Sequence, residues 1–243
     1  MTPFDLIDTE RYRLAPFSVP CPHCGHVTVY RSDLTKLYPS NTSKTAFDHG
    51  LVDHDAVAGT LFGRCQCTNR DCQEFTDFVG PFVTEVDEDE KPPIAHRFKL
   101  KWFYPAVPLI HVPPAVPKEV QELLRRAYAP AFSDQSASGN LVRSAIEALL
   151  TKLRVPRFVI KKGRRRRLSL HDRIQRLPAR FEKQRTRLLA VKWIGNVASH
   201  ANLTPPGLRS AFKIVEDVLE ELYGTDRFDL LRSVRRINRR RKP

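Results

Sequence analysis

Apolar residues recur at helical spacing in the second half of the chain. They return every three or four residues from Val120 to Ala131 and again from Val142 to Leu153, and Pro156 follows the second series. A stripe at this period is typical of an amphipathic helix that packs one face on a core. Each series therefore predicts a helix.

Capping signals predict two more helices further along the chain. Ser169 with Asp172 three residues later resembles a capping box, which would begin a short helix. Thr204 suits the N-cap of the last helix and Pro205 its first helical position, while Gly224 is well placed to end it. A long helix over about residues 179–201 is expected between these two.

The first hundred residues have a shorter and less regular pattern. HVTVY and FTDFVGPFV are rich in β-branched and aromatic residues next to turn formers, which predicts strands. We expect a helix around Asp53–Leu61 between them, and a solvated loop at the acidic run Asp87–Glu90.

A proline-rich segment separates the two patterns. Prolines at this density exclude helix and favour extended backbone; they are Pro105, Pro108, Pro113, Pro114 and Pro117. The predicted fold is α+β: a small β domain at 1–103, a proline-rich arm at 104–117, a bundle of about five helices at 118–224 and a basic tail at 225–243.

Charge is distributed unevenly along the chain. The net charge is +14, yet residues 1–100 hold 10 Lys/Arg and 15 Asp/Glu, which leaves +19 for the remainder. A half this basic favours a polyanionic partner, of which nucleic acid is the commonest inside cells, ahead of an acidic protein. The predicted contacts lie in the loop KKGRRRR and in the tail: Lys161, Lys162, Arg164, Arg165, Arg166, Arg167, Arg235, Arg236, Arg239, Arg240 and Arg241.

Apolar runs are too short to cross a membrane, and the N-terminus lacks the pattern of a signal peptide. We therefore expect a soluble, cytoplasmic protein. There is no Gly-rich phosphate loop of the Walker type, no nucleophile elbow and no EF-hand spacing.

The cysteines are grouped in a way that predicts a metal site. Cys21-Pro-His-Cys24-Gly is typical of a zinc knuckle, and Cys72 belongs to a second cluster. In a reducing compartment, such grouping indicates metal rather than disulfides. The fourth ligand is Cys67 or Cys65, and we favour Cys67 because Cys-x4-Cys can form a second knuckle. A structural Zn²⁺ is the predicted cofactor, ahead of unliganded cysteines or a redox pair.

Two pairs of residues in the helical half are candidates for chemistry. Arg143 and Glu147 lie one helical turn apart, and their simplest interpretation is an intrahelical ion pair. Asn196 and His200 share a face near the end of the long predicted helix, where a histidine can also simply interact with the helix dipole.

These motifs carry a family resemblance. LVRSAIEALL, followed about fifty residues later by IGNVASHA, resembles a bacterial domain-of-unknown-function family related to the HEPN superfamily, in which an N-terminal zinc ribbon is common. The resemblance covers roughly Tyr104–Gly224. It implies a helical domain that forms homodimers and occurs with phage-defence or restriction proteins.

The resemblance also implies a metal-independent ribonuclease site, with Arg143 and Glu147 as further candidates. In HEPN ribonucleases, the residues matching Asn196 and His200 accompany an arginine, and the histidine assists attack by the RNA 2′-hydroxyl. The arginine position is Gly195 in this chain, so another residue would have to stabilise the phosphate charge.

Three functions follow from these observations. We place a nucleic-acid-binding protein with a defence or regulatory role first, acting on RNA or DNA. The alternatives are a ribonuclease that uses His200, and a dimerising interaction module that does not bind nucleic acid.

Overall fold

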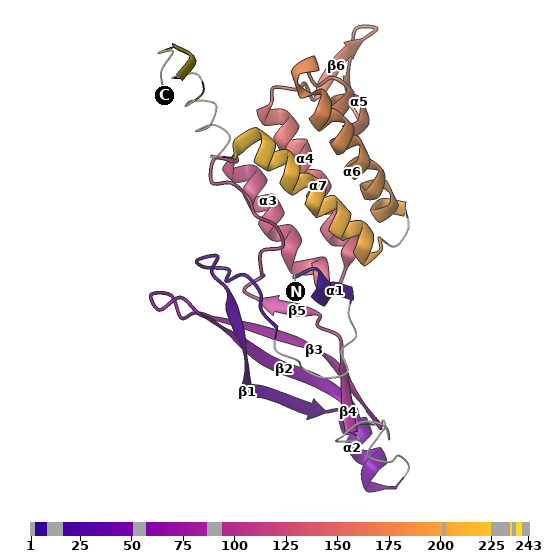
Figure 1. Ribbon diagram of the computed structural model, residues 1–243. Coiled ribbons are helices and arrows are strands. Elements are labelled where there is room, and N and C mark those ends of the chain that lie inside the picture. Colours follow the sequence, from indigo (N-terminus) through magenta and orange to yellow (C-terminus); the bar gives the residue numbers. More distant parts are fainter. Residues whose placement is uncertain are drawn as a thin grey trace. The chain divides into compact units, whose positions relative to one another are not determined.

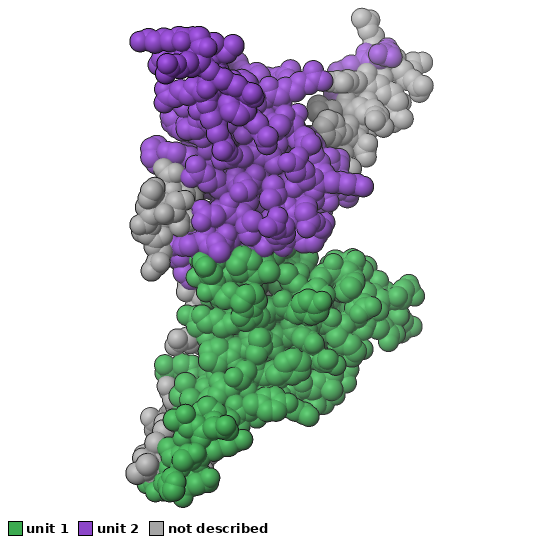
Figure 2. All heavy atoms as spheres, turned by 180° about the vertical axis from the view of Figure 1, so that it is seen from behind, with its two compact units in different colours: residues 1–109, 128–135 green, residues 110–127, 136–243 purple. Residues whose placement is uncertain are grey.

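The computed structural model describes residues 3–8, 17–50, 57–86, 94–200, 203–224, 234 and 237–239, with backbone alone for 85–86, 94–95 and 195–200. Its contacts divide the chain into two compact units (Figure 2). Unit 1 comprises residues 1–109 and 128–135, and unit 2 comprises residues 110–127 and 136–243. An N-terminal antiparallel sheet and C-terminal helices confirm the α+β class (Figure 1).

Unit 1 is built on an antiparallel sheet. The strands β1 (Thr28–Pro39), β2 (Ala58–Cys67), β3 (Phe75–Val86) and β4 (Ile94–Phe98) lie side by side in that order, and β5 (Trp102–Tyr104) also pairs with β3 (Figure 1). Consecutive strands pair with one another, so most of the sheet is a meander.

The structure confirms the predicted strand at FTDFVGPFV, which lies within β3, and the one at HVTVY, whose last three residues begin β1. The helix predicted around Asp53–Leu61 is wrong where the structure describes it, because residues 58–61 begin β2. Buried and less buried positions alternate along β2 from Leu61 to Cys67, and pairing on both sides overrides local propensity. Residues 51–56 and Asp87–Glu90 lie outside the described part of the chain.

The helix α2 (Asn41–Asp48) was not predicted. Its N-cap is Ser40, whose hydroxyl accepts a hydrogen bond from the backbone N–H of Ser43. A short segment at the N-terminus, α1 (Asp5–Asp8), is also helical.

Aromatic rings form the core on one face of the sheet. Phe78 lies on β3, and its ring centroid is 5.2 Å from that of Phe17 and 6.0 Å from that of Phe103. Phe132, from the 3₁₀ helix η2 (Ala129–Phe132), joins the cluster at 4.8 Å from Phe103. Burying each of these rings contributes roughly 1.5–3 kcal/mol. Gly63 on β2 leaves room for Phe78, since a Cβ there would lie 2.3 Å from its ring.

The proline-rich segment forms no helix or strand between residues 105 and 117. Its apolar side chains are nevertheless buried. Val107 and Leu109 belong to unit 1, whereas Ile110 and Val116 belong to unit 2. The segment thus contributes to both cores.

The α-helices of unit 2 include α3 (Lys118–Tyr128), α4 (Gln135–Lys152), α5 (Leu170–Gln175), α6 (Glu182–His200) and α7 (Pro205–Tyr223). A short 3₁₀ turn, η3 (Ala179–Phe181), precedes α6. None of the described helices is long and apolar enough to cross a bilayer.

The predicted capping signals are confirmed. Ser169 and Asp172 form a full capping box at the start of α5. The Thr204 hydroxyl accepts a hydrogen bond from the Gly207 N–H, so α7 begins where the sequence predicted. Gly224 ends α7 with a φ of −62°, not in the left-handed conformation that favours glycine.

The basic segment KKGRRRR was predicted as a loop, and the structure corrects this. Residues Phe158–Lys161 (β6) and Arg164–Arg167 (β7) pair as an antiparallel hairpin, which we call the basic hairpin. Lys162 and Gly163 connect the strands with φ values of 51° and 73°. Two successive residues with positive φ match the right-handed twist of a hairpin, and Gly163 adopts this conformation without steric cost.

Candidate functional site

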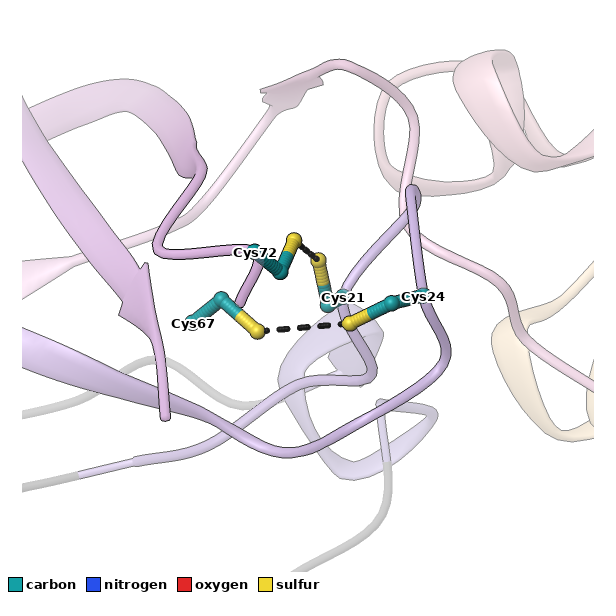
Figure 3. Close-up of side chains that lie close together, drawn as sticks. All are labelled: Cys21, Cys24, Cys67 and Cys72. Atoms are coloured by element: carbon teal, nitrogen blue, oxygen red, sulfur yellow. Dashed lines mark hydrogen bonds between the residues drawn. The ribbon is translucent and has the colours of Figure 1, made fainter. Parts of the chain in front are cut away.

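Four cysteines from two distant segments meet in unit 1. Cys21 and Cys24 precede β1, Cys67 ends β2, and Cys72 lies in the turn before β3. Their Sγ atoms all lie within 4.8 Å of one another and point to a common centre (Figure 3). The Cys24–Cys67 sulfur distance is 3.4 Å and the Cys21–Cys72 distance is 3.9 Å.

A tight turn shapes the first half of this four-cysteine centre. The N–H of Cys21 donates to the carbonyl of His26 at 2.7 Å, and the N–H of Gly25 donates to the carbonyl of Cys21 at 2.9 Å. Gly25 has a φ of 75°, which explains why glycine follows the second cysteine. Both sulfurs are thereby brought to one side of the turn.

A second turn shapes the other half. The N–H groups of Cys72 and Gln73 both donate to the carbonyl of Asn69. The backbone N–H and hydroxyl of Thr68 both donate to the carbonyl of Val27, at 3.0 and 2.8 Å. These bonds join the two segments that carry the cysteines, independently of any metal.

Backbone amides are directed at the sulfur atoms. At three of the cysteines, the N–H two residues later interacts with the sulfur, in the pairs Cys24–His26, Cys67–Asn69 and Cys72–Glu74. The His26 N–H is the main reason that the pKa of Cys24 falls to about 6. Burial raises the pKa of Cys67 to about 12. Amides in these positions stabilise negative charge on sulfur, as a thiolate bound to a metal requires.

Cys65 lies apart from this centre. It is on the same face of β2 as Cys67 but two residues deeper in the sheet, and it is 0% exposed. Burial raises the pKa of its thiol to about 12, although Thr28 opposes the shift through a hydrogen bond. The structure thus assembles Cys67, and not Cys65, with the other three cysteines.

The geometry of the centre fits a metal ion. A regular tetrahedron with metal–sulfur bonds of about 2.3 Å has sulfur atoms roughly 3.8 Å apart. The distances of 3.4 and 3.9 Å bracket that value. The remaining sulfur pairs lie within 4.8 Å, so they would have to approach by at most about 1 Å to bind one ion.

Every residue of the basic hairpin except the half-buried Val159 is exposed. The side chains of Lys161, Lys162 and Arg164–Arg167 are all accessible. Ile160 is 76% exposed, and Phe158 is 40% exposed with the guanidinium of Arg165 3.9 Å from its ring centroid. Cations and apolar side chains therefore share one ribbon.

Ion pairs leave most of this charge uncompensated. Within the described residues, Arg167 is the only cation of the basic hairpin that pairs with a carboxylate, at 3.3 Å from Glu147. Arg143 approaches the same carboxylate at 3.8 Å, which confirms the predicted intrahelical ion pair on α4. Glu147 thus connects the hairpin to α4.

Other predicted residues lie partly or wholly outside the described part of the chain. Arg239 is described and exposed, whereas Arg235, Arg236, Arg240 and Arg241 are outside it. The backbone of Gly195, Asn196 and His200 is the last part of α6, but their side chains are not among those described.

Comparison with known proteins adds one match. Residues 125–240 match the sequence profile of a family described as "Domain of unknown function (DUF4145)". The matched region includes the basic hairpin and α4 to α7, and it excludes all four cysteines of the centre. No curated protein and no solved structure matches the chain.

Proposed function

We propose that the protein binds nucleic acid through its phosphate backbone, with the basic hairpin as the contact surface. The observation that supports this most is the concentration of uncompensated positive charge on an exposed ribbon. Six cations lie between residues 161 and 167, and only Arg167 is paired within the described chain. Phosphates that contact such cations release condensed counterions, which drives binding.

Cross-strand pairing in the hairpin supports a polyanionic partner. Lys161 lies directly opposite Arg164, next to the turn. Like charges in this arrangement destabilise a hairpin, and a bound phosphate between them would relieve the repulsion. A bound anion is therefore expected to stabilise the hairpin.

The shape and apolar content of the hairpin suit nucleic acid in two ways. A two-stranded ribbon is narrow enough to enter the major groove of a duplex. Exposed aromatic rings such as Phe158 stack on unpaired bases. Comparing duplex with single-stranded probes distinguishes these modes.

The four-cysteine centre has a supporting role in this proposal. We infer that it holds Zn²⁺, because four thiolates with this spacing are the usual ligands of structural zinc. All four tetrahedral positions would be taken by cysteine, which leaves none open for a substrate. The ion would brace the segment before β1 against the end of β2.

A charge-neutralising variant tests the proposal. Replacing Arg164, Arg165 and Arg166 with Gln should weaken binding tenfold or more at moderate salt. It should also reduce the slope of log K against log salt by about two to three. The matched control neutralises three exposed cations on the helices of unit 2: Arg126, Lys183 and Lys213. Equal losses in the two triple variants would contradict the hairpin as the contact surface.

The two alternative functions make different predictions. If the protein acts only as a dimerising interaction module, it should show no salt-dependent affinity for nucleic acid. The ribonuclease depends on His200 and Asn196, whose side chains lie outside the described residues, so it stays a prediction. Comparing RNA cleavage by wild type and His200→Ala tests it directly.

A further inference from the structure

A cavity of about 240 Å³ lies at the base of the basic hairpin, within unit 2. Its lining consists of Glu147, Arg157, Phe158, Arg167, Leu168 and Arg173. A single water molecule requires only about 10–15 Å³ of such space, so the cavity has room for a larger polar group. Three arginines and one carboxylate give the lining a formal charge of +2.

Arg173 is the least exposed of these cations, at 3%. Its guanidinium donates to the carbonyl of Glu147 at 3.0 Å, to the hydroxyl of Thr151 at 2.9 Å and to the carbonyl of Val155 at 3.3 Å. All three acceptors are uncharged. Among the described residues, no carboxylate lies within ion-pair distance of Arg173, and its Nε has no hydrogen-bond partner. A buried cation in this state is costly unless an anion approaches it.

Thr151 contacts a second arginine of the lining, Arg157, as well as Arg173. Its hydroxyl donates to the carbonyl of Glu147 at 2.9 Å and accepts from Arg173 and from Arg157 Nε, the latter at 3.2 Å. Two guanidinium groups thus converge on one oxygen atom. Burial lowers the pKa of Arg173, and the charges of Arg157 and Arg167 lower it further, whereas Glu147 opposes the shift.

Glu147 balances only part of this charge. Its carboxylate pairs with Arg167 at 3.3 Å and with Arg143 at 3.8 Å. Arg157 and Arg173 have no ion pair of their own in the described part of the chain. The single carboxylate of the lining therefore offsets only part of the charge of its three guanidinium groups.

We propose that this cavity binds a phosphate group. A phosphate monoester is a compact dianion whose oxygens match the paired N–H groups of guanidinium. The exposed side chains of Arg157 and Arg167 can turn toward the phosphate. The buried Arg173 supplies positive charge at a fixed position in the lining. The phosphate belongs either to the 5′ end of a nucleic-acid strand held by the basic hairpin or to a free small molecule. In the first case, the site rests on the proposed nucleic-acid function and extends it.

Inorganic phosphate is the first probe, measured by calorimetry on the full chain at constant ionic strength. Arg157→Gln and Arg167→Gln should each weaken phosphate binding roughly 10- to 100-fold, the effect expected for a charge-assisted hydrogen bond. Arg176→Gln, an exposed arginine that does not line the cavity, is the matched control. Absence of saturable binding by wild type, or equal effects of Arg157→Gln and Arg176→Gln, would overturn the proposal.

Glu147→Gln should change phosphate affinity in the opposite direction from the arginine variants. Removing the only carboxylate in the lining should strengthen phosphate binding several-fold. A purely structural role for Glu147 predicts weaker or unchanged binding, which would count against the site. The thermal midpoint of each variant shows whether it is folded.

Oligonucleotides with a 5′-phosphate or a 5′-hydroxyl identify the source of the group. A preference for the 5′-phosphate that Arg157→Gln abolishes indicates the end of a strand. If the two oligonucleotides bind with equal affinity and inorganic phosphate still binds, the ligand of the cavity is a free phosphate compound. The triple variant of Arg164, Arg165 and Arg166 separates the two proposals, because it should lose oligonucleotide binding and keep the phosphate site.

Discussion

The sulfur atoms of Cys24 and Cys67 lie 3.4 Å apart, although 43 positions separate the two residues in the chain. Cys24 belongs to the turn before β1, and Cys67 is the last residue of β2. Because β1 and β2 are antiparallel, the start of one strand lies beside the end of the other. Sheet pairing thus brings the two cysteines together.

Alanine substitutions on β2 should separate a ligand from a core residue. Cys67→Ala should abolish stoichiometric zinc binding, because it removes one of four ligands. Cys65→Ala, two residues earlier on the same face, should retain one zinc per chain and lose stability only through packing. Elemental analysis of the purified variants measures this. Loss of zinc from Cys65→Ala and not from Cys67→Ala would refute the ligand set.

Metal removal should destabilise unit 1. Ligand thiols must be deprotonated to bind zinc, so protons compete with the metal and acidification should release it. A chelator at neutral pH should have the same effect. We expect a lower thermal midpoint and faster amide exchange in β1 and β2, while α4 and α7 keep their protection. Hydrogen exchange followed by mass spectrometry resolves the two units; uniform loss of protection would argue against a local role.

The turn of the basic hairpin can be perturbed without changing charge. Gly163 has a φ of 73°, and a Cβ at this position would have no other atom within 4 Å, so Gly163→Ala would introduce backbone strain alone. Strain of about 1 kcal/mol should weaken nucleic-acid binding several-fold and leave the salt slope unchanged. Gly50→Ala in unit 1, where φ is 65° and the surroundings are equally open, is the matched control. It should bind like wild type.

The capping box of α5 should make stability depend on pH. Hydrogen bonds from Ser169 lower the pKa of Asp172 below its ordinary value of 3.8. This stabilisation is complete above pH 3.8 and is lost as the pH falls through the lower pKa of the folded state. The advantage of wild type over Asp172→Asn in urea denaturation should therefore narrow in acid. The stability difference between wild type and Ser169→Ala should also narrow in acid. A difference in unfolding free energy that stays constant with pH would contradict this role of the capping box.

Local interactions explain why much of unit 2 could be predicted. Thr204 and Pro205 mark the start of α7 through contacts within one turn, and the buried stripe from Leu208 to Leu219 follows from helical periodicity. The cysteine spacing likewise predicted the turn at Cys21 and Cys24. In each case the residues that interact are close in the sequence, so the pattern contains the information.

Features that depend on distant pairing were predicted less well. The composition of KKGRRRR indicated a loop, but Phe158 and Arg167 pair across a turn that Lys162 and Gly163 make possible. Residues 58–61 form a strand through pairing with β1 and β3, which are distant in the sequence, so the local pattern does not reveal it.

The amino-acid sequence determined the helix positions of unit 2, the cysteine grouping and the surplus of positive charge, since each depends on residue type and short-range spacing. Tertiary structure decided that Cys67, rather than Cys65, joins the centre, because depth in the sheet separates two cysteines that share a face. It also brought Arg157 and Arg173 together at Thr151. Contacts of this kind arise when the chain buries its core, and helical or strand periodicity does not encode them.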